Sequence, residues 1–231
     1  MFSLVVRHLR KDFGTLRVIR GLSFTVNHAE CFGLLGINGA GKTTTFQLLT
    51  GLMQPTSGEA YMNDIVMTEQ PRQWQSNIGY CPQHRGLHGK LNAYESLFLY
   101  ARLRGVPERQ IPALVESMIR VVDLVPHAHN VTESYSGGNK RKLSMAIAMI
   151  GLPYLVFLDE PTAGVDVMAR RKIFAAVQNI REESGISIIL TSHSMDECEA
   201  VCDRIAIMVD GQLQCLGTLQ HLKRKFGRGC L

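Results

Sequence analysis

The segment Gly36-Ile37-Asn38-Gly39-Ala40-Gly41-Lys42-Thr43 decides the fold of this 231-residue chain. It matches the pattern G-x-x-x-x-G-K-[ST], and it lies between an apolar run and a stretch of helical periodicity. Its glycines let backbone N–H groups wrap around a chain of phosphates, and the following helix points the positive end of its dipole at the same anion. The sequence therefore predicts a phosphate-binding loop between a strand and a helix.

The side chains of this loop have predicted roles of their own. Lys42 reaches the β- and γ-phosphates of a nucleotide, and Thr43 supplies a ligand for Mg²⁺. We expect the nucleotide to contact Gly36, Asn38, Gly39, Ala40, Gly41, Lys42, Thr43 and Thr44. Kinases, GTPases and ATPases all use such a loop, so other residues must distinguish these classes.

Apolar runs that alternate with helical segments surround the loop. The runs at 31–35, 78–81, 155–158, 186–191 and 204–209 predict strands, and periodicity predicts helices at 42–52, 94–103, 110–124, 140–150, 170–183 and 195–201. Continuous apolar strands separated by helices indicate a mainly parallel, buried sheet. We therefore predict an α/β fold with a P-loop NTPase core.

Two further parts are expected beside this core. The predicted strands at 4–10, 22–26 and 60–62 have no helices between them, which indicates a smaller antiparallel sheet near the N-terminus. The middle of the chain is almost wholly helical, and we interpret it as a helical subdomain inserted at about 84–150. The whole chain, 1–231, is then one nucleotide-binding domain.

The net charge of +5 fits a nucleotide, an anionic membrane surface or a nucleic acid. Clustered positive charge occurs at 140–142, 170–172 and 223–225 without interleaved aromatic residues, so we expect these runs to be solvated or to face phosphate, and we expect no nucleic-acid partner. Six scattered cysteines indicate reduced thiols, although Cys198, Cys202 and His193 leave a zinc site as an alternative.

Neither a signal peptide nor a membrane-spanning helix is predicted. The first residues have no basic segment ahead of a long apolar stretch. The longest apolar run, 145–158, is interrupted by Pro153 and is shorter than the roughly 18 to 20 residues that span a bilayer. It is typical of a helix end followed by a buried strand.

Two acids end the apolar strand at 155–158. Asp159 is placed to hold Mg²⁺, and Glu160 is placed to polarise an attacking water as a general base. Without a cation or a water network the two buried carboxylates would repel each other. The pair therefore favours nucleotide hydrolysis.

His193 follows another apolar strand, and parallel neighbours would bring it beside the strand that ends at Asp159. Its ring can donate to a γ-phosphate oxygen, whereas a histidine taken alone would suit a structural role. The other motifs favour the phosphate.

Ser136-Gly137-Gly138-Asn139 introduces a second apolar helix. Ser136 suits an N-cap, and the glycines leave backbone amides open to an anion. One chain needs only one γ-phosphate site, so the simplest use of Ser136, Gly137 and Gly138 is to contact a nucleotide held by another subunit. A plain helix cap is the alternative.

In this order the motifs resemble the nucleotide-binding domain of an ABC transporter, over essentially the whole chain. The resemblance implies the following assignments: Walker A at 36–43, the Q-loop glutamine at Gln83, the signature at 136–139, Walker B at 155–159, the D-loop acid at Asp166 and the switch histidine at His193. It makes Glu160, His193 and Gln83 catalytic, Thr43, Gln83 and Asp159 ligands of Mg²⁺, and Asp166 a contact of the nucleotide site. Phe13 falls where the family places an aromatic ring on adenine, with a core position as the alternative.

The resemblance also implies partners. Two such domains pair head to tail around two ATP molecules, and they drive transmembrane domains of the same or a partner chain at the cytoplasmic face of a membrane. The wording at 135–144, 191–195 and 220–223 resembles subfamily A, whose members mainly move lipids or sterols. We therefore expect an ATP-hydrolysing motor domain for lipid transport, with the membrane segments on a longer parent chain or on a partner.

This chain departs from the subfamily pattern at two places. Val165 and Val167 flank Asp166 where Met and Pro are usual, and His84-Arg85-Gly86-Leu87-His88 follows Gln83 where an aromatic–acidic pair is usual. The departures fall where the family places communication between paired domains and contact with the membrane domain.

Other classes fit less well. A soluble ABC-type ATPase acting on ribosomes or nucleic acid would suit the basic charge, but such proteins usually carry two nucleotide domains or a long coiled coil. A GTPase or a small-molecule kinase would not need Ser136-Gly137-Gly138, and the chain lacks the guanine-reading motif [NT]-K-x-D.

Overall fold

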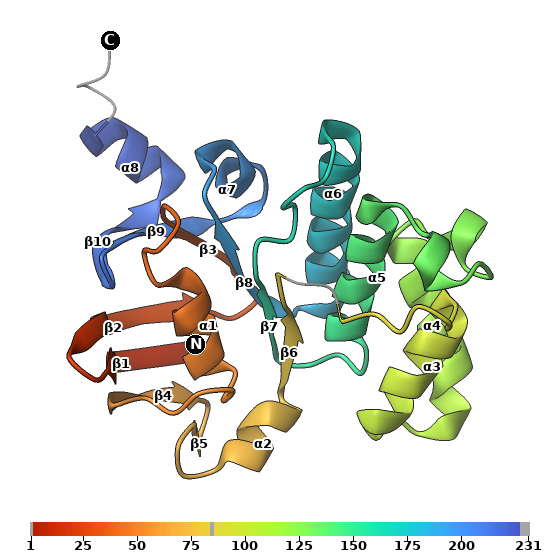
Figure 1. Ribbon diagram of the computed structural model, residues 1–231, viewed down its shortest axis with the longest axis horizontal. Coiled ribbons are helices and arrows are strands. Elements are labelled where there is room, and N and C mark those ends of the chain that lie inside the picture. Colours follow the sequence, from red (N-terminus) through yellow and green to blue (C-terminus); the bar gives the residue numbers. More distant parts are fainter. Residues whose placement is uncertain (1, 84–85, 227–231) are drawn as a thin grey trace.

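A computed structural model describes residues 2–83 and 86–226 and contains two β-sheets of different kinds. The larger sheet has six strands in the order β10-β9-β3-β8-β7-β6 (Figure 1). Its strands are β3 (Cys31–Leu35), β6 (Ile78–Cys81), β7 (Leu155–Leu158), β8 (Ser187–Ser192), β9 (Arg204–Val209) and β10 (Gln212–Thr218). From β6 to β9 the neighbours are parallel, whereas β10 is antiparallel to β9.

The central strands of this sheet are mainly apolar because both of their faces are covered. Leu155 and Phe157 of β7 point into one core cluster, and Val156 and Leu158 point into the other. Such two-sided burial is the usual state of a parallel sheet. Since the carboxyl ends of β3, β6, β7 and β8 meet at one edge, the residues that follow them are brought together there.

The smaller sheet is antiparallel, with the order β2-β1-β4-β5. It comprises β1 (Phe2–Phe13), β2 (Leu16–Asn27), β4 (Ser57–Met62) and β5 (Ile65–Val66). The helix α1 (Lys42–Leu49) lies between the two sheets, and its Phe46, Leu48 and Leu49 side chains are fully buried in the core that the sheets share (Figure 1).

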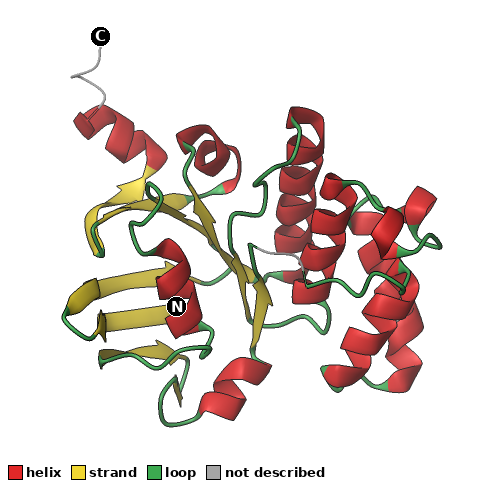
Figure 2. Cartoon of the chain, in the orientation of Figure 1, coloured by secondary structure: helices red, strands yellow, loops and turns green. Residues whose placement is uncertain are grey.

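Most of the remaining helices lie on the side of the larger sheet that is away from the smaller sheet (Figure 2). The remaining helices are α2 (Pro71–Ser76), α3 (Ala93–Leu103), α4 (Ile111–Val121), α5 (Gly137–Met149), α6 (Val167–Ser184), α7 (Met195–Val201) and α8 (Leu219–Phe226), with short 3₁₀ turns at Glu108–Gln110, Val125–His127 and Thr132–Ser134. Helices α3, α4 and α5 contact one another in the stretch for which an inserted helical subdomain is predicted. The α/β fold class is confirmed.

Helix ends differ from the predicted bounds where capping groups act. Ser136 starts α5 three residues early, because its hydroxyl accepts the Asn139 N–H at 3.2 Å. Asp166 does the same for α6 by accepting the Ala169 N–H at 2.9 Å. α1 ends at Leu49, ahead of Gly51, whose φ of 72° is left-handed.

Four elements were not predicted from the sequence, namely α2, β5, β10 and α8. Two of them bury little: α2 buries only Trp74, and β10 alternates between exposed and half-buried residues. Weak burial leaves a weak hydrophobic pattern.

Some predicted features lie outside the described residues. His84 and Arg85, in the departure after Gln83, belong to them, as does Cys230. Within 2–83 and 86–226, no helix is both long and apolar enough to cross a membrane. The described part of the chain also contains no group of three or more His, Cys, Asp or Glu side chains that could hold a metal ion.

Candidate nucleotide-binding site

The loop between β3 and α1 has a backbone that requires glycine. A Cβ at Gly36 would lie 2.7 Å from the Met208 carbonyl oxygen, and one at Gly41 would lie 2.9 Å from Ile19 Cδ1. Gly41 also has a φ of 104°, and Gly39 one of 82°, in the left-handed region. These contacts and dihedrals explain the spacing of the glycines in the motif.

Lys42, the first residue of α1, folds its side chain back over this loop. Its ammonium donates to the carbonyls of Gly36 at 2.8 Å and Ile37 at 3.2 Å, and it lies 3.5 Å from Glu160 Oε1. The residue is only 5% exposed, and a buried ammonium is stable only where acceptors surround it. The positive charge is therefore fixed at the mouth of the loop.

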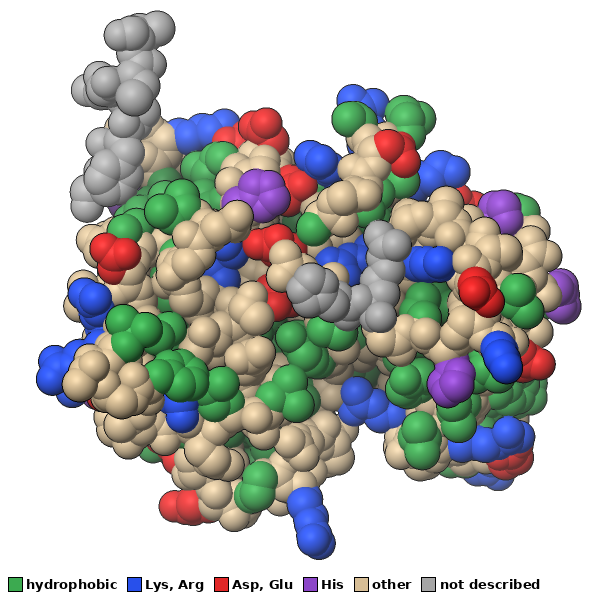
Figure 3. Space-filling view, viewed as in Figure 1, with side chains coloured by type: hydrophobic (Ala, Val, Ile, Leu, Met, Phe, Trp, Pro, Cys, Tyr) green, Lys and Arg blue, Asp and Glu red, His purple; other side chains and the backbone are tan. Residues whose placement is uncertain are grey.

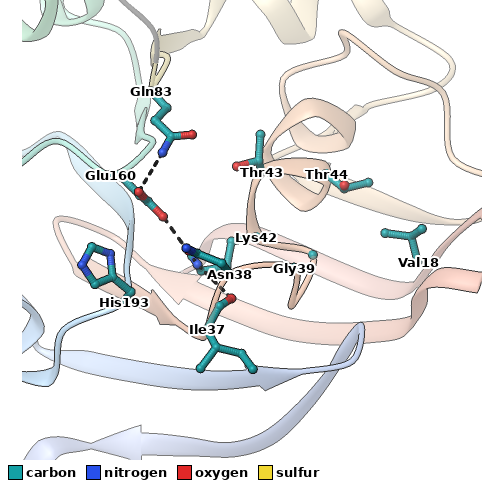
Figure 4. A pocket seen from close by; sticks show the side chains of 11 residues that line it. Val18, Ile37, Asn38, Gly39, Lys42, Thr43, Thr44, Gln83, Glu160 and His193 are labelled. Atoms are coloured by element: carbon teal, nitrogen blue, oxygen red, sulfur yellow. Dashed lines mark hydrogen bonds and ion pairs between the residues drawn. The ribbon is translucent and has the colours of Figure 1, made fainter. Parts of the chain in front are cut away.

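A cavity of about 790 Å³ opens above the loop. This volume lies within the usual range for small-molecule sites. Side chains from three strand ends and the loop converge on it (Figure 4). Its lining comprises Val18, Ile37, Asn38, Gly39, Gly41, Lys42, Thr43, Thr44, Gln83, Glu160 and His193.

Asp159 ends β7 beneath this cavity and is fully buried. Its Oδ1 accepts the Thr191 hydroxyl at 2.6 Å, whereas its Oδ2 has no hydrogen-bond partner among the described residues. Burial raises the pKa of Asp159, and hydrogen bonds from Thr191 and Thr43 oppose that rise. The unpartnered Oδ2 of Asp159 and the hydroxyl of Thr43, which interacts with the same carboxyl, make an oxygen donor set that suits Mg²⁺.

Glu160 extends across the cavity between two donors. The Gln83 amide donates to its Oε2 at 2.9 Å, and Lys42 lies 3.5 Å from its Oε1 (Figure 4). Its N–H donates to the Thr191 hydroxyl at 2.9 Å, and its φ of 45° is left-handed, which is unusual for a residue other than glycine. The chain accepts local backbone strain to hold this carboxylate in place.

His193 follows β8 and is exposed at the rim of the same cavity. Because β8 pairs in parallel with β7, it lies on the side of the site where Glu160 ends the neighbouring strand (Figure 4). The sequence-based expectation that the two strand ends are neighbours is therefore confirmed.

Several predicted site residues do not line this cavity as the described residues define it: Phe13, Gly36, Ala40, Ser136, Gly137, Gly138, Asp159 and Asp166. Gly36 and Ala40 belong to the loop whose other residues line the cavity, and Asp159 directly precedes the lining residue Glu160. Phe13 is 46% exposed near the turn from β1 to β2, which rules out the core alternative.

The starts of α5 and α6 lie against each other. A Cβ at Gly138 would be 3.0 Å from Ala169 Cβ and 3.7 Å from Val165 Cγ1. The segment around Gly138 and the segment around Asp166 therefore pack against each other, and neither is among the described residues that line the cavity.

Arg141 is a residue of the site that sequence reasoning missed. The sequence predicts a solvated or phosphate-facing run at 140–142, but Arg141 is 1% exposed and Lys142 is 4% exposed, so the prediction is wrong for both. From α5 the guanidinium donates to the carbonyls of Pro82, Gln83, Asp159, Glu160 and Pro161. The only signal in the sequence for this role of Arg141 is its position just after the glycine-rich start of a helix.

Comparison with known proteins identifies the class that this fold and site define. The family model described as "ABC transporter" matches residues 19–163. The chain therefore belongs to the ABC transporter family and is an ATPase domain of it.

Individual relatives narrow the comparison. The chain is 51% identical to human "Phospholipid-transporting ATPase ABCA3" over 98% of its length and 52% identical to human "Retinal-specific phospholipid-transporting ATPase ABCA4" over 88%. It spans only 13% and 9% of those proteins. Among solved structures, "Structure of ATP binding subunit of ABC transporter" matches with a TM-score of 0.87 at 28% identity, covering 99% of this chain and 95% of that one.

Proposed function

We propose that this domain hydrolyses ATP with Mg²⁺ as the motor of a lipid transporter, at the cytoplasmic face of a membrane. The observation that carries the hydrolysis proposal is the position of Glu160, between Lys42 and Gln83 and beside the buried Asp159. Lipid as the cargo is supported by identity near 50% to relatives whose names describe phospholipid transport.

The residues of the cavity divide the chemistry among them. Backbone N–H groups of the loop and Lys42 bind the β- and γ-phosphates. Glu160 orients the attacking water and takes up its proton, while the Gln83 amide fixes the carboxylate at 2.9 Å. His193 donates a hydrogen bond to a γ-phosphate oxygen at the rim.

Thr43, Gln83 and Asp159 would hold Mg²⁺, which when bound neutralises charge that develops on the phosphate oxygens. The fit rests on Asp159 Oδ2, a buried oxygen without a partner in the described chain. Phe13, which is exposed at the end of β1 in the antiparallel sheet, is available to stack on the adenine.

A second domain of the same kind would complete the site. Ser136, Gly137, Gly138 and Asp166 would reach a nucleotide held by that partner, in a head-to-tail pair. The proposal is supported by the packing of the starts of α5 and α6 against each other, and by the absence of both from the described lining of this chain's own cavity. Transmembrane domains of the same or a partner chain would receive the movement.

The alternative, a soluble ATPase acting on ribosomes or nucleic acid, draws support only from the basic charge. Part of that charge is internal, because Arg141 and Lys142 are buried. On the face shown in Figure 3, basic side chains are scattered from the sheets to the helical side and are interspersed with acidic ones. The arrangement does not favour a nucleic-acid groove.

The test of hydrolysis is phosphate release by the purified chain with MgATP, compared with Glu160→Gln. Removing the base should lower turnover by about 10²–10⁴-fold and leave ATP affinity nearly intact. Normal turnover in this variant would show that Glu160 is not the base.

Transport needs a separate test. The full-length protein that contains this domain, reconstituted in vesicles with a fluorescent phospholipid, should move the lipid between leaflets with ATP and not with Glu160→Gln. ATP hydrolysis without lipid movement would leave the ATPase proposal standing and contradict the cargo.

A further inference from the structure

Glu197, in α7, is a buried carboxylate that the chemistry described above does not use. It is 6% exposed, and it is not among the described residues that line the cavity. Its Oε1 accepts the Thr162 hydroxyl at 2.8 Å and lies 3.2 Å from Arg170 Nη1, and its Oε2 accepts the Ser192 hydroxyl at 2.5 Å. A carboxylate is buried at high cost unless it is paired in this way, so the arrangement calls for a reason.

The contact with Ser192 reaches His193. The Ser192 hydroxyl also accepts the Ser194 N–H at 2.9 Å, so hydrogen bonds fix the backbone on both sides of His193. The Ser192 carbonyl accepts the Gly36 N–H at 3.2 Å. Glu197 thereby fixes a residue that contacts both the phosphate loop and the backbone next to His193.

The other contacts of Glu197 reach the segment that carries Glu160. Thr162 lies two residues after Glu160, and its carbonyl accepts the Val165 N–H at 3.2 Å. Arg170 lies in the first turn of α6, where its N–H donates to the Asp166 carbonyl at 2.9 Å. Arg170 Nε has no hydrogen-bond partner among the described residues, and Nη1 of the same guanidinium forms an ion pair with Glu197 Oε1.

We propose that Glu197 is a positioning residue for ATP hydrolysis. It joins Ser192 to Thr162 and Arg170, and so it holds the His193 ring in register with Glu160 and with the loop around Asp166. This inference rests on the proposed ATPase function and adds to it a residue that touches neither nucleotide nor water.

The test compares two glutamates of α7. Glu197→Gln keeps the size of the side chain but removes its charge and one acceptor oxygen, whereas Glu199→Gln makes the same change at a surface site paired with Lys223 at 2.9 Å. Because a misplacement of about 1 Å costs up to about 10²-fold in rate, we expect Glu197→Gln to lower kcat about tenfold with KM for MgATP changed less than about twofold. Glu199→Gln should keep the wild-type kcat.

A second variant and a second readout separate positioning from stability. Ser192→Ala breaks the same link without removing a charge, and it should lower kcat similarly. In chain labelled at histidine Cε1, the NMR resonance of His193, assigned with His193→Gln, should shift in Glu197→Gln and in Ser192→Ala but not in Glu199→Gln.

The outcomes are distinct. Wild-type kcat in both Glu197→Gln and Ser192→Ala would overturn the proposal. A lower kcat with an unmoved His193 resonance would overturn it too, because Glu197 would then act by another route. An inactive wild type whose His193 resonance still moves would overturn the ATPase function and leave the positioning contact established.

Discussion

Two helices of this domain begin in glycine-rich sequence, and they differ in where those beginnings point. α1 follows Gly41 in a left-handed conformation, without a side-chain cap in the described chain, and Lys42 and Thr43 face the cavity. α5 follows Ser136, whose hydroxyl caps the helix, and its start lies against α6. Glycine and a helix start are therefore insufficient for a complete nucleotide site; the first needs Glu160 and Asp159 beside it, and the second has neither.

Although the start of α5 does not line the cavity, α5 contacts the backbone of the site through one side chain. Arg141, one turn into α5, donates to the carbonyls of Gln83, Asp159 and Glu160. α1 thus contributes side chains that line the cavity, whereas α5 holds the backbone of Gln83 and Glu160 through Arg141.

The largest expected effect is on the free energy of unfolding and concerns the contacts of Arg141. Arg141→Met should lower the free energy of unfolding by about 3 kcal/mol, because several buried carbonyls lose a charged donor. Arg171→Met, at an exposed position of α6, is the matched control and should change little. Urea unfolding measures both, and a loss below about 1 kcal/mol for Arg141→Met would mean that α5 is not anchored through its guanidinium.

The next effect compares lysines at the two helix starts. Lys42→Ala should weaken ATP binding by about 100-fold, since a hydrogen bond to a charged group contributes roughly 1.5–3 kcal/mol. Lys140→Ala, in the first turn of α5, should leave the affinity unchanged, because Lys140 donates to the Glu133 carbonyl away from the cavity. Equal losses in a fluorescent-nucleotide titration would erase the distinction between the two starts.

The proposed pairing with a second domain predicts a smaller effect at α5. Ser136→Ala removes the cap and should lower turnover about tenfold, with the affinity of the single domain for ATP unchanged. The turnover rate of the wild type should also rise more steeply than linearly with protein concentration. Strict proportionality in a demonstrated monomer would contradict the pairing.

The smallest effect lies at the base of α5. Lys172 and Lys142 hydrogen-bond to Asp123 and hold the pKa of that carboxyl below its ordinary value. A lowered folded-state pKa stabilises above the unfolded pKa and loses this contribution as pH falls through the folded value. Asp123→Asn should therefore cost about 0.5 kcal/mol at pH 7, discounted because the side chain is half exposed, and almost nothing near pH 2. An equal loss at both pH values would rule out the ion pairs as the cause.

Sequence reasoning found the residues at the strand ends more readily than the buried residues that hold them in position. Strands with apolar patterns are identifiable, and parallel strands end at one edge. The residue pattern alone was therefore enough to place the strand before Asp159 beside the strand before His193. The burial of Arg141 could not be predicted, because its partners are carbonyl oxygens, which every residue carries. Glu197 was missed for a similar reason: its partners Thr162, Ser192 and Arg170 are common polar residues without a distinctive spacing.

The left-handed backbone of Glu160 sets a limit on engineering this domain. At a φ of 45° an ordinary side chain is strained, so glycine is the residue that a search for thermostable variants would select there. That substitution would also delete the carboxylate held between Lys42 and Gln83. Libraries of stabilised variants that include position 160 should therefore also be screened for ATP turnover. Selection for heat resistance alone would favour inactive protein.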